Sequence, residues 1–314
     1  MTHVIGIDLG GTKTAAGVVS ADGSVLLTAQ TPTLNRDGGE AILDATASLV
    51  RGLWERAAAA GIEVSAVGMG SAGVIDADRG AVVSATDAIL GWAGTRIKSG
   101  LQTRLGLPAG AVSVVNDVHA HAIGEAWLGA GAGASSMLML AFGTGVGGSF
   151  VIGGRPLLGH RYVGGHVGHF ASSYAVAADG SELACTCGRR GHVEAIASGP
   201  ALHALYLRSG GDPGAVDTRE VFARANAGEV VALRAVDTAA RAAGEAIGGL
   251  ANVLDPEVVV VSGGLADAGA LWWDRMTCAA AQELMPPLAG LRIERARLGN
   301  TAAVVGAAAL ALRA

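Results

Sequence analysis

The chain has 314 residues, of which 51% are hydrophobic and 16% charged, so it is too apolar to be intrinsically disordered and long enough for two domains. Its formal net charge of -5, with no Lys/Arg block, disfavours a protein that binds nucleic-acid backbones. No apolar run reaches the ~18 residues needed to span a bilayer, and no signal peptide precedes the first apolar run. We therefore expect a cytoplasmic protein with neither nucleic acid nor membrane as partner. Glycine is the anomaly, because 49 residues are about twice the usual ~7% share.

The first half of the chain is predicted to alternate strands and helices. Apolar runs at 4–9, 14–20 and 24–29, with the turn Asp22-Gly23, predict three antiparallel strands. Apolar residues recurring on one face over 40–60 predict a helix that stops at Gly61. Strands are expected at 64–69 and 112–115, followed by a helix at about 118–128. This alternation predicts the α/β class.

The second half repeats the opening pattern. A strand at 137–142, a glycine turn from Gly143 to Gly148 and a strand at 149–152 echo the first hairpin, which indicates two related domains. Residues 153–199 form a long irregular stretch rich in His, Gly and Cys, typical of a functional insertion. Helices resume near Pro200, a last central strand is expected at 258–261, and 301–312 predicts a closing helix.

Two glycine turns are candidate phosphate loops. Glycines leave backbone N–H groups open to a phosphate, Thr and Lys add donors, and an Asp at the strand end can hold a hydrated Mg²⁺. An ordinary Gly-Gly hairpin turn remains the alternative for the first loop. The second matches G-x-G-x-x-G, but a strand follows it and no acidic residue occurs before Asp179, so we reject a Rossmann site; a Walker A motif is absent. The candidate nucleotide-binding residues are Asp8, Gly10, Gly11, Thr12, Lys13, Gly143, Thr144, Gly145, Gly147, Gly148, Gly263 and Gly264.

Asn116 and Asp117 end an apolar strand where a helix begins. A carboxylate there can accept the proton of a substrate hydroxyl as it attacks a phosphoryl group, and Asn116 can hydrogen-bond a neighbouring hydroxyl. The alternative is that the Asp serves only as a helix cap.

The irregular stretch holds a candidate zinc site. Cys185-x-Cys187-x4-His192 with an upstream His offers soft ligands for a tetrahedral, structural Zn²⁺, although scattered His and Cys residues are often only structural. Glu194 follows closely and either presents its carboxylate to a polyol or is the N-terminal acid of the next helix.

Five motifs, in this order, resemble the ROK family of sugar kinases and repressors over essentially the whole chain. The resemblance implies an actin-like (ribonuclease H-like) fold, with two α/β domains around a central cleft where ATP and sugar meet. It implies a smaller domain at 1–117, closed by a C-terminal helix at 299–314, and a larger one at 118–298 with the zinc insertion. We expect a homodimer or homotetramer. The motifs are Asp8-Leu-Gly-Gly-Thr-Lys13, Asn116-Asp117, Gly143-Thr-Gly-Val-Gly-Gly148, Gly165-His-Val-Gly-His169 and Cys185-Thr-Cys-Gly-Arg-Arg-Gly-His-Val-Glu194.

The resemblance also assigns roles. It makes the protein an ATP:hexose 6-phosphotransferase that uses ATP, Mg²⁺ and a structural Zn²⁺, with Asp117 as general base for the sugar 6-hydroxyl. The implied sugar-binding residues are Ser71, Gly73, Asp87, Asn116, Asp117, His166, His169 and Glu194. The implied zinc ligands are His169, Cys185, Cys187 and His192, with His192 where the family normally has a third cysteine.

The sugar is predicted from one departure. Glucokinase-like members usually carry Glu where this chain has His166, whereas bacterial N-acetylmannosamine kinases resemble it in having His. A neutral His leaves room for a 2-acetamido group, so N-acetyl-D-mannosamine is the main prediction and glucose the alternative. A sugar-sensing repressor is disfavoured, because the first strand begins at Val4 and leaves no room for a DNA-binding domain. A catalytically silent sugar-binding protein is a further alternative.

Overall fold

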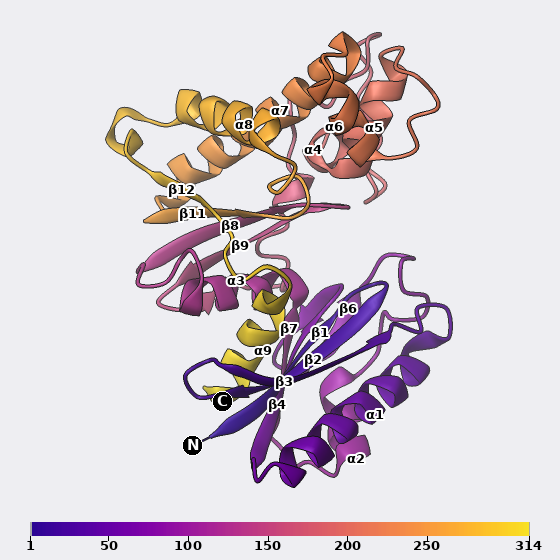
Figure 1. The fold of residues 1–314 in the computed structure, drawn as a ribbon, viewed down its shortest axis with the longest axis vertical. Coiled ribbons are helices and arrows are strands. Elements are labelled where there is room, and N and C mark those ends of the chain that lie inside the picture. Colours follow the sequence, from indigo (N-terminus) through magenta and orange to yellow (C-terminus); the bar gives the residue numbers. More distant parts are fainter. Residues whose placement is uncertain (1, 314) are drawn as a thin grey trace. The chain divides into compact units, whose positions relative to one another are not determined.

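The computed structural model describes residues 2–313 and divides into two compact units, each built on a mixed sheet with helices (Figure 1). The first unit contains the N-terminal stretch up to Gly133, the segment Val151–Gly164, and the chain from Arg297 onward. The second contains Ala134–Phe150 and Gly165–Ala296. Within the described residues, no helix has the length and apolar character needed to cross a membrane.

The sheet of the first unit has the strand order β3-β2-β1-β4-β7. β1 pairs antiparallel with β2 and parallel with β4, and β4 pairs parallel with β7. The central strands are buried, whereas edge strand β3 alternates half-buried and exposed residues. The elements are β1 (His3–Leu9), β2 (Lys13–Ser20), β3 (Val25–Pro32), α1 (Gly38–Ala59), β4 (Val64–Ser71), β5 (Val74–Asp76), β6 (Ala81–Ser84), α2 (Ile97–Leu105), β7 (Val112–Asn116), α3 (Asp117–Leu128), β10 (Arg155–Pro156), η3 (Gly299–Thr301) and α9 (Ala302–Leu312).

The C-terminal helix α9, yellow in Figure 1, packs closely on the sheet of the first unit. Glycines in the strands make this approach possible: a Cβ on Gly6 would lie 2.0 Å from the Val304 carbonyl oxygen, and one on Gly68 would lie 1.7 Å from that of Ala307. α9 is mostly alanine and buried along almost its whole length. Small residues on both sides therefore fix the helix against β1 and β4.

The second sheet has the same kind of mixed topology, with the strand order β10-β9-β8-β11-β12. The short strand β10 pairs antiparallel with the last residues of β9. β11 is buried at all five positions and pairs parallel with both neighbours, which explains its continuous valine run. α7 packs along α8 on the second unit's apolar core. The elements are β8 (Ser136–Phe142), β9 (Val146–Ile152), η1 (Val167–His169), α4 (Glu194–Ala197), α5 (Gly199–Arg208), α6 (Thr218–Asn226), α7 (Val230–Leu254), β11 (Val258–Ser262), α8 (Ala270–Glu283), η2 (Pro286–Leu288) and β12 (Arg292–Arg295).

The expected domains were 1–117 with 299–314, and 118–298; the two units of the structure have different boundaries. Residues 1 and 314 of the expected first domain lie outside the described residues. α3 groups with the first unit because it packs against α9, where a Cβ on Gly124 would lie 2.2 Å from the Ala302 carbonyl oxygen. The second glycine turn is also shorter than expected, since β9 already begins at Val146.

Candidate functional site

The carboxyl ends of three neighbouring parallel strands gather polar residues in the first unit. The register pairs Leu9 with Ser71 and Ser71 with Asn116, so the ends of β1, β4 and β7 are level. Asp8 therefore lies near Asp117. Burial first, and then the neighbouring Asp117 carboxylate, raise the pKa of Asp8 to about 6, while Lys13 opposes the shift.

The first glycine turn is held by backbone and side-chain hydrogen bonds. The Gly10 N–H donates to the Lys13 carbonyl at 3.0 Å. Thr33 Oγ1 donates to the Gly10 carbonyl, and Asn35 Nδ2 donates to that of Gly11, both at 2.8 Å. Thr12 and Lys13 are exposed at the turn, so their donors are available to a ligand.

Asn116 and Asp117 both contact the first turn of α3. Asn116 caps this helix, because its Oδ1 accepts from Val118 N at 2.9 Å, while its Nδ2 donates to the Gly73 carbonyl. Asp117 Oδ1 accepts from Val118 N at 2.9 Å. Gly73 itself has φ +100°, and a Cβ there would lie 2.8 Å from the Ser84 carbonyl oxygen. The helix cap thus falls to Asn116, and the carboxylate beside it is positioned but not required for capping.

Ser71 and Asp87 differ sharply in exposure. Ser71 is fully buried, and its hydroxyl accepts from Trp92 Nε1 at 3.3 Å and donates to the Ala72 carbonyl. Its hydrogen bonds therefore already join β4 to the loop that carries Trp92. Asp87 is exposed in that loop.

Replacing Asp8 by Asn should stabilise the metal-free protein at neutral pH. Because the pKa of Asp8 is raised from 3.8 to about 6 in the folded protein, the free energy of unfolding falls as the pH rises between these two values. Above pH 6 the whole destabilisation by the ionised Asp8 remains. We expect Asp8→Asn to gain up to about 3 kcal/mol at pH 7.5, and about half as much at pH 5. Urea unfolding in a chelator at both pH values measures this. The exposed Asp274→Asn variant is the control, and an equal gain at both pH values would contradict the pKa shift.

The second glycine turn lies in the second unit at the end of β8. The Gly143 N–H donates to the Gly145 carbonyl at 2.9 Å, and the Gly143 carbonyl accepts from Gly199 N at 2.8 Å. A second loop approaches through Gly263, which has φ +91° and whose Cβ would lie 2.4 Å from the Phe142 carbonyl oxygen. Only glycine fits at that position.

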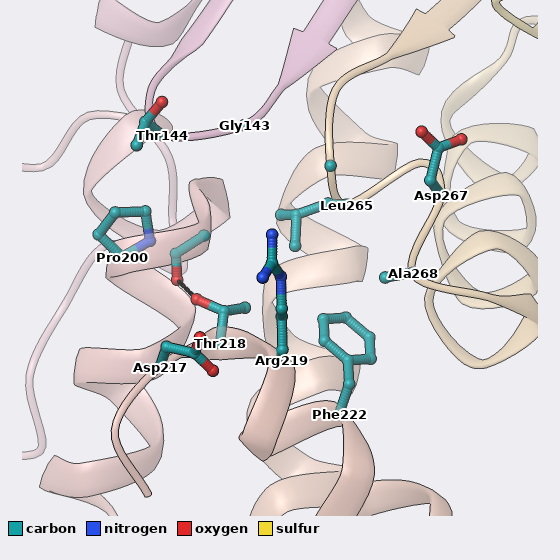
Figure 2. Close-up of a pocket in the computed structure, with 12 residues that line it drawn as sticks. Gly143, Thr144, Pro200, Asp217, Thr218, Arg219, Phe222, Leu265, Asp267 and Ala268 are labelled. Carbon is teal, nitrogen blue, oxygen red and sulfur yellow. Dashed lines mark hydrogen bonds between the residues drawn. The ribbon is translucent and has the colours of Figure 1, made fainter. Parts of the chain in front are cut away.

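These two loops border a pocket of about 800 Å³, which lies wholly in the second unit (Figure 2). Its volume is in the range of cofactor and nucleotide sites. Of the predicted nucleotide-binding residues, Gly143, Thr144 and Gly264 line it, whereas Gly147 and Gly148 belong to strand β9. The lining residues not predicted from the sequence are Gly199, Pro200, Asp217, Thr218, Arg219, Phe222, Leu265, Asp267 and Ala268.

The four predicted metal ligands come together in the second unit. One ligand atom from each of His169, Cys185, Cys187 and His192 lies within 4.8 Å of all the others. Cys185 Sγ is 3.6 Å from His169 Nδ1, and Cys187 Sγ is 3.3 Å from His192 Nδ1. A tetrahedral Zn²⁺ with ordinary bond lengths has S···N edges of roughly 3.6 Å, so this donor set fits the ion.

Glu194 connects this cluster to the glycine turn. Its Oε2 accepts from Val146 N at 2.9 Å, while its Oε1 accepts from the Thr186 hydroxyl. A Cβ on Gly145 would lie 2.8 Å from the same Oε2, so glycine leaves room for the carboxylate. His166 lies nearby, with its ring centroid 6.3 Å from that of His169. Of the predicted residues, His166 and Glu194 for the sugar, the four metal ligands and Gly145 for the phosphate therefore lie close together in this unit.

Comparisons with known proteins agree with this architecture. The ROK family model matches residues 4–314. The glucokinase of Streptomyces coelicolor is 36% identical, and the N-acetyl-D-glucosamine kinase of Erwinia tasmaniensis 30%; the matches cover 99% and 98% of this chain, and 98% and 99% of those proteins. A ROK glucokinase from Streptomyces griseus, solved with glucose and AMPPNP, is 32% identical with a TM-score of 0.80, covering 99% of this chain and all of that one. The expected actin-like α/β fold is confirmed, and the chain belongs to the ROK family.

Proposed function

We propose that this protein transfers the γ-phosphoryl group of ATP to the 6-hydroxyl of a hexose, with glucose as the preferred sugar. The observation that carries the proposal is the alignment of β1, β4 and β7, which gathers Asp8, Asn116 and Asp117 at one edge of the first sheet. Phosphoryl transfer needs a positioned base and fixed phosphates rather than covalent chemistry by the protein. The carboxylates lie in the first unit, and the second unit contains a pocket suited to a nucleotide donor.

In this mechanism Asp117 accepts the proton of the sugar hydroxyl as its oxygen bonds to the γ-phosphorus and the bond to the ADP oxygen breaks. Asn116 cannot move freely, because it caps α3 and contacts the Gly73 carbonyl. It thereby fixes the start of the helix that carries Asp117. Glycine-turn N–H groups and the exposed Thr12 and Lys13 bind phosphate oxygens, and Mg²⁺ held near Asp8 would neutralise phosphate charge.

The proposed preference for glucose rests on the names of similar proteins and not on a contact between a residue and the sugar. The 36% identical protein from Streptomyces coelicolor and the 32% identical one from Streptomyces griseus are both named glucokinases. The prediction of N-acetylmannosamine, which rested on His166 and on the segment Val193-Glu-Ala-Ile-Ala-Ser-Gly199, is not supported by these relatives. N-acetylglucosamine is the second candidate, because a 30% identical relative is named for that sugar.

A coupled assay of ADP release across glucose, mannose, N-acetylglucosamine and N-acetylmannosamine tests the proposal. We expect kcat/KM for glucose to exceed that for either acetamido sugar at least tenfold, which corresponds to about 1.4 kcal/mol in the transition state. A preference for N-acetylmannosamine would instead favour the interpretation of His166. No ADP release with any hexose would refute the kinase proposal itself.

We further propose that the cluster of His169, Cys185, Cys187 and His192 binds one structural Zn²⁺ per chain. The ion would fix the irregular segment around Glu194, whose carboxylate contacts the glycine turn.

Removing one zinc ligand should release the metal. We expect Cys187→Ser to weaken zinc affinity more than the ~10–100-fold typical of losing a ligand's hydrogen-bond partner, because the ligand bond itself is lost. Elemental analysis after a chelator wash measures the zinc. Cys278→Ser is the matched control, since Cys278 lies exposed on α8 outside the cluster, and it should retain the metal. Wild-type protein purified with zinc in the medium but containing none would contradict the assignment.

A further inference from the structure

The side chain of Arg219 extends into the pocket of the second unit from the first turn of α6 (Figure 2). Pro200 and Thr218 lie on one side of it, and Leu265 and Ala268 on the other. Across the described residues no hydrogen bond or ion pair engages its guanidinium. Arg224, on the same helix, instead contacts three carboxylates. Arg219 is therefore a cation directed into a cavity without a protein partner.

The helix that carries Arg219 is held firmly at the pocket. Asp217 caps α6 by accepting from Glu220 N at 3.0 Å, and Thr218 Oγ1 donates to the Gly199 carbonyl at 2.7 Å, which joins α6 to the start of α5. The ion pairs of Arg224 with Asp212, Glu220 and Glu229 tie the preceding loop and the start of α7 to the same helix. The position of the Arg219 backbone is thus fixed before a ligand binds.

The chemistry around Arg219 suits a nucleobase better than a phosphate. The wall on this side of the pocket is apolar, with Phe222, Leu265 and Ala268. The carboxylates of Asp217 and Asp267 also line the pocket and would repel a polyphosphate chain lying among them. Phosphates are better placed at the glycine turn, where Gly143 and Thr144 line the pocket and no side chain of Gly143 blocks the main chain. A planar base needs apolar contact and tolerates a guanidinium against its face.

We propose that the guanidinium of Arg219 packs flat on the purine base of the donor nucleotide and so selects a nucleoside triphosphate over inorganic polyphosphate. This inference rests on the proposed kinase function, which supplies the nucleotide. The glycine loops serve any phosphate chain alike, so binding energy from the base is what distinguishes the two donors.

Direct binding of adenosine, measured by calorimetry, tests the contact without requiring turnover. Arg219→Ala should raise the Kd of adenosine about 5- to 30-fold, the range for a cation on an aromatic face. The Kd of tripolyphosphate should not change. Arg208→Ala, at the exposed end of α5 and outside the pocket lining, is the matched control and should change neither value. Circular dichroism checks that both variants fold.

Arg219→Lys separates stacking from charge, because Lys keeps the charge but loses the planar group. It should recover only part of the adenosine affinity. The proposal is overturned if Arg219→Ala leaves adenosine binding unchanged, if it weakens tripolyphosphate equally, or if Lys restores affinity fully. If instead adenosine binds as expected but no hexose is phosphorylated, the kinase function fails while the contact stands.

Discussion

Replacing Asp117 by Asn should lower kcat by about 10²- to 10⁴-fold while the protein remains folded. The amide still accepts the hydrogen bond from Val118 N, which the carboxylate makes at 2.9 Å, so the start of α3 is preserved. What is lost is the group that takes the proton from the sugar hydroxyl. Because this step occurs only in the transition state, KM for the sugar should change little. Steady-state kinetics with a coupled ADP assay measures both values.

A purely structural role for Asp117 predicts a different result. An acidic residue in the first turn of a helix contributes only about 0.3–1 kcal/mol to stability, and its loss would leave kcat intact. Glu40→Gln is the control, because Glu40 also lies in the first turn of a helix, α1, where it is exposed and pairs only with Arg104 among the described residues. If Asp117→Asn behaves like Glu40→Gln in both unfolding and turnover, Asp117 is not the base.

Local sequence patterns predicted the elements around the first part of the site well. The helix expected at 40–60 is α1, Gly38–Ala59, because its apolar residues recur at helical spacing and Gly61 follows. The strands before Asn116 and after Ser136 were likewise found within one or two residues. Motif order alone could not show that Asn116, rather than Asp117, caps α3 through Val118 N.

Of the residues that line the donor pocket, the sequence predicted only Gly143, Thr144 and Gly264. Its other wall comes from α6 and from residues 265–268, which approach Gly143 only through tertiary packing. Arg219 and Phe222 lie in an amphipathic helix whose sequence resembles any surface helix, so no local signal marks them as lining a cavity. Tertiary pairing also explains why the second glycine turn is shorter than predicted. Gly147 and Gly148 have low strand propensity, but they pair within strand β9.

The glycine excess is explained by close packing as well as by loops. Gly129 lies against the side chain of Glu125, because a Cβ at this position would lie 2.0 Å from Glu125 Oε2. Gly131 donates its N–H to the Glu125 carbonyl oxygen, and Gly133 has φ +84°. These glycines allow the chain to turn closely around the buried carboxylate of Glu125. Nothing in the local sequence indicates that Glu125 is buried, so this reason for the glycines could not be predicted.

The carboxylate of Glu125 should contribute strongly to the stability of the first unit. Glu125 is fully buried, and both of its oxygens accept backbone N–H groups. Ala130 N donates to Oε2 at 2.8 Å, Leu298 N donates to Oε1 at 2.7 Å, and Arg297 N is 3.0 Å from both. The chain leaves the first unit after Gly133 and returns to it at Arg297. The hydrogen bonds of Glu125 hold the backbone close to both of these positions.

Glu125→Gln should therefore destabilise the protein by about 3–5 kcal/mol, although the two side chains have the same shape. Whichever way the amide turns, its NH₂ group faces a backbone donor, so hydrogen bonds are lost and a buried N–H is left unpaired. Glu245→Gln is the matched control, because within the described part of the chain Glu245 accepts only from the Tyr174 hydroxyl, through Oε1, and an amide oxygen can replace it. Urea unfolding midpoints measure both variants. A loss below about 1 kcal/mol in Glu125→Gln would mean that the segment from Arg297 is held by α9 packing alone.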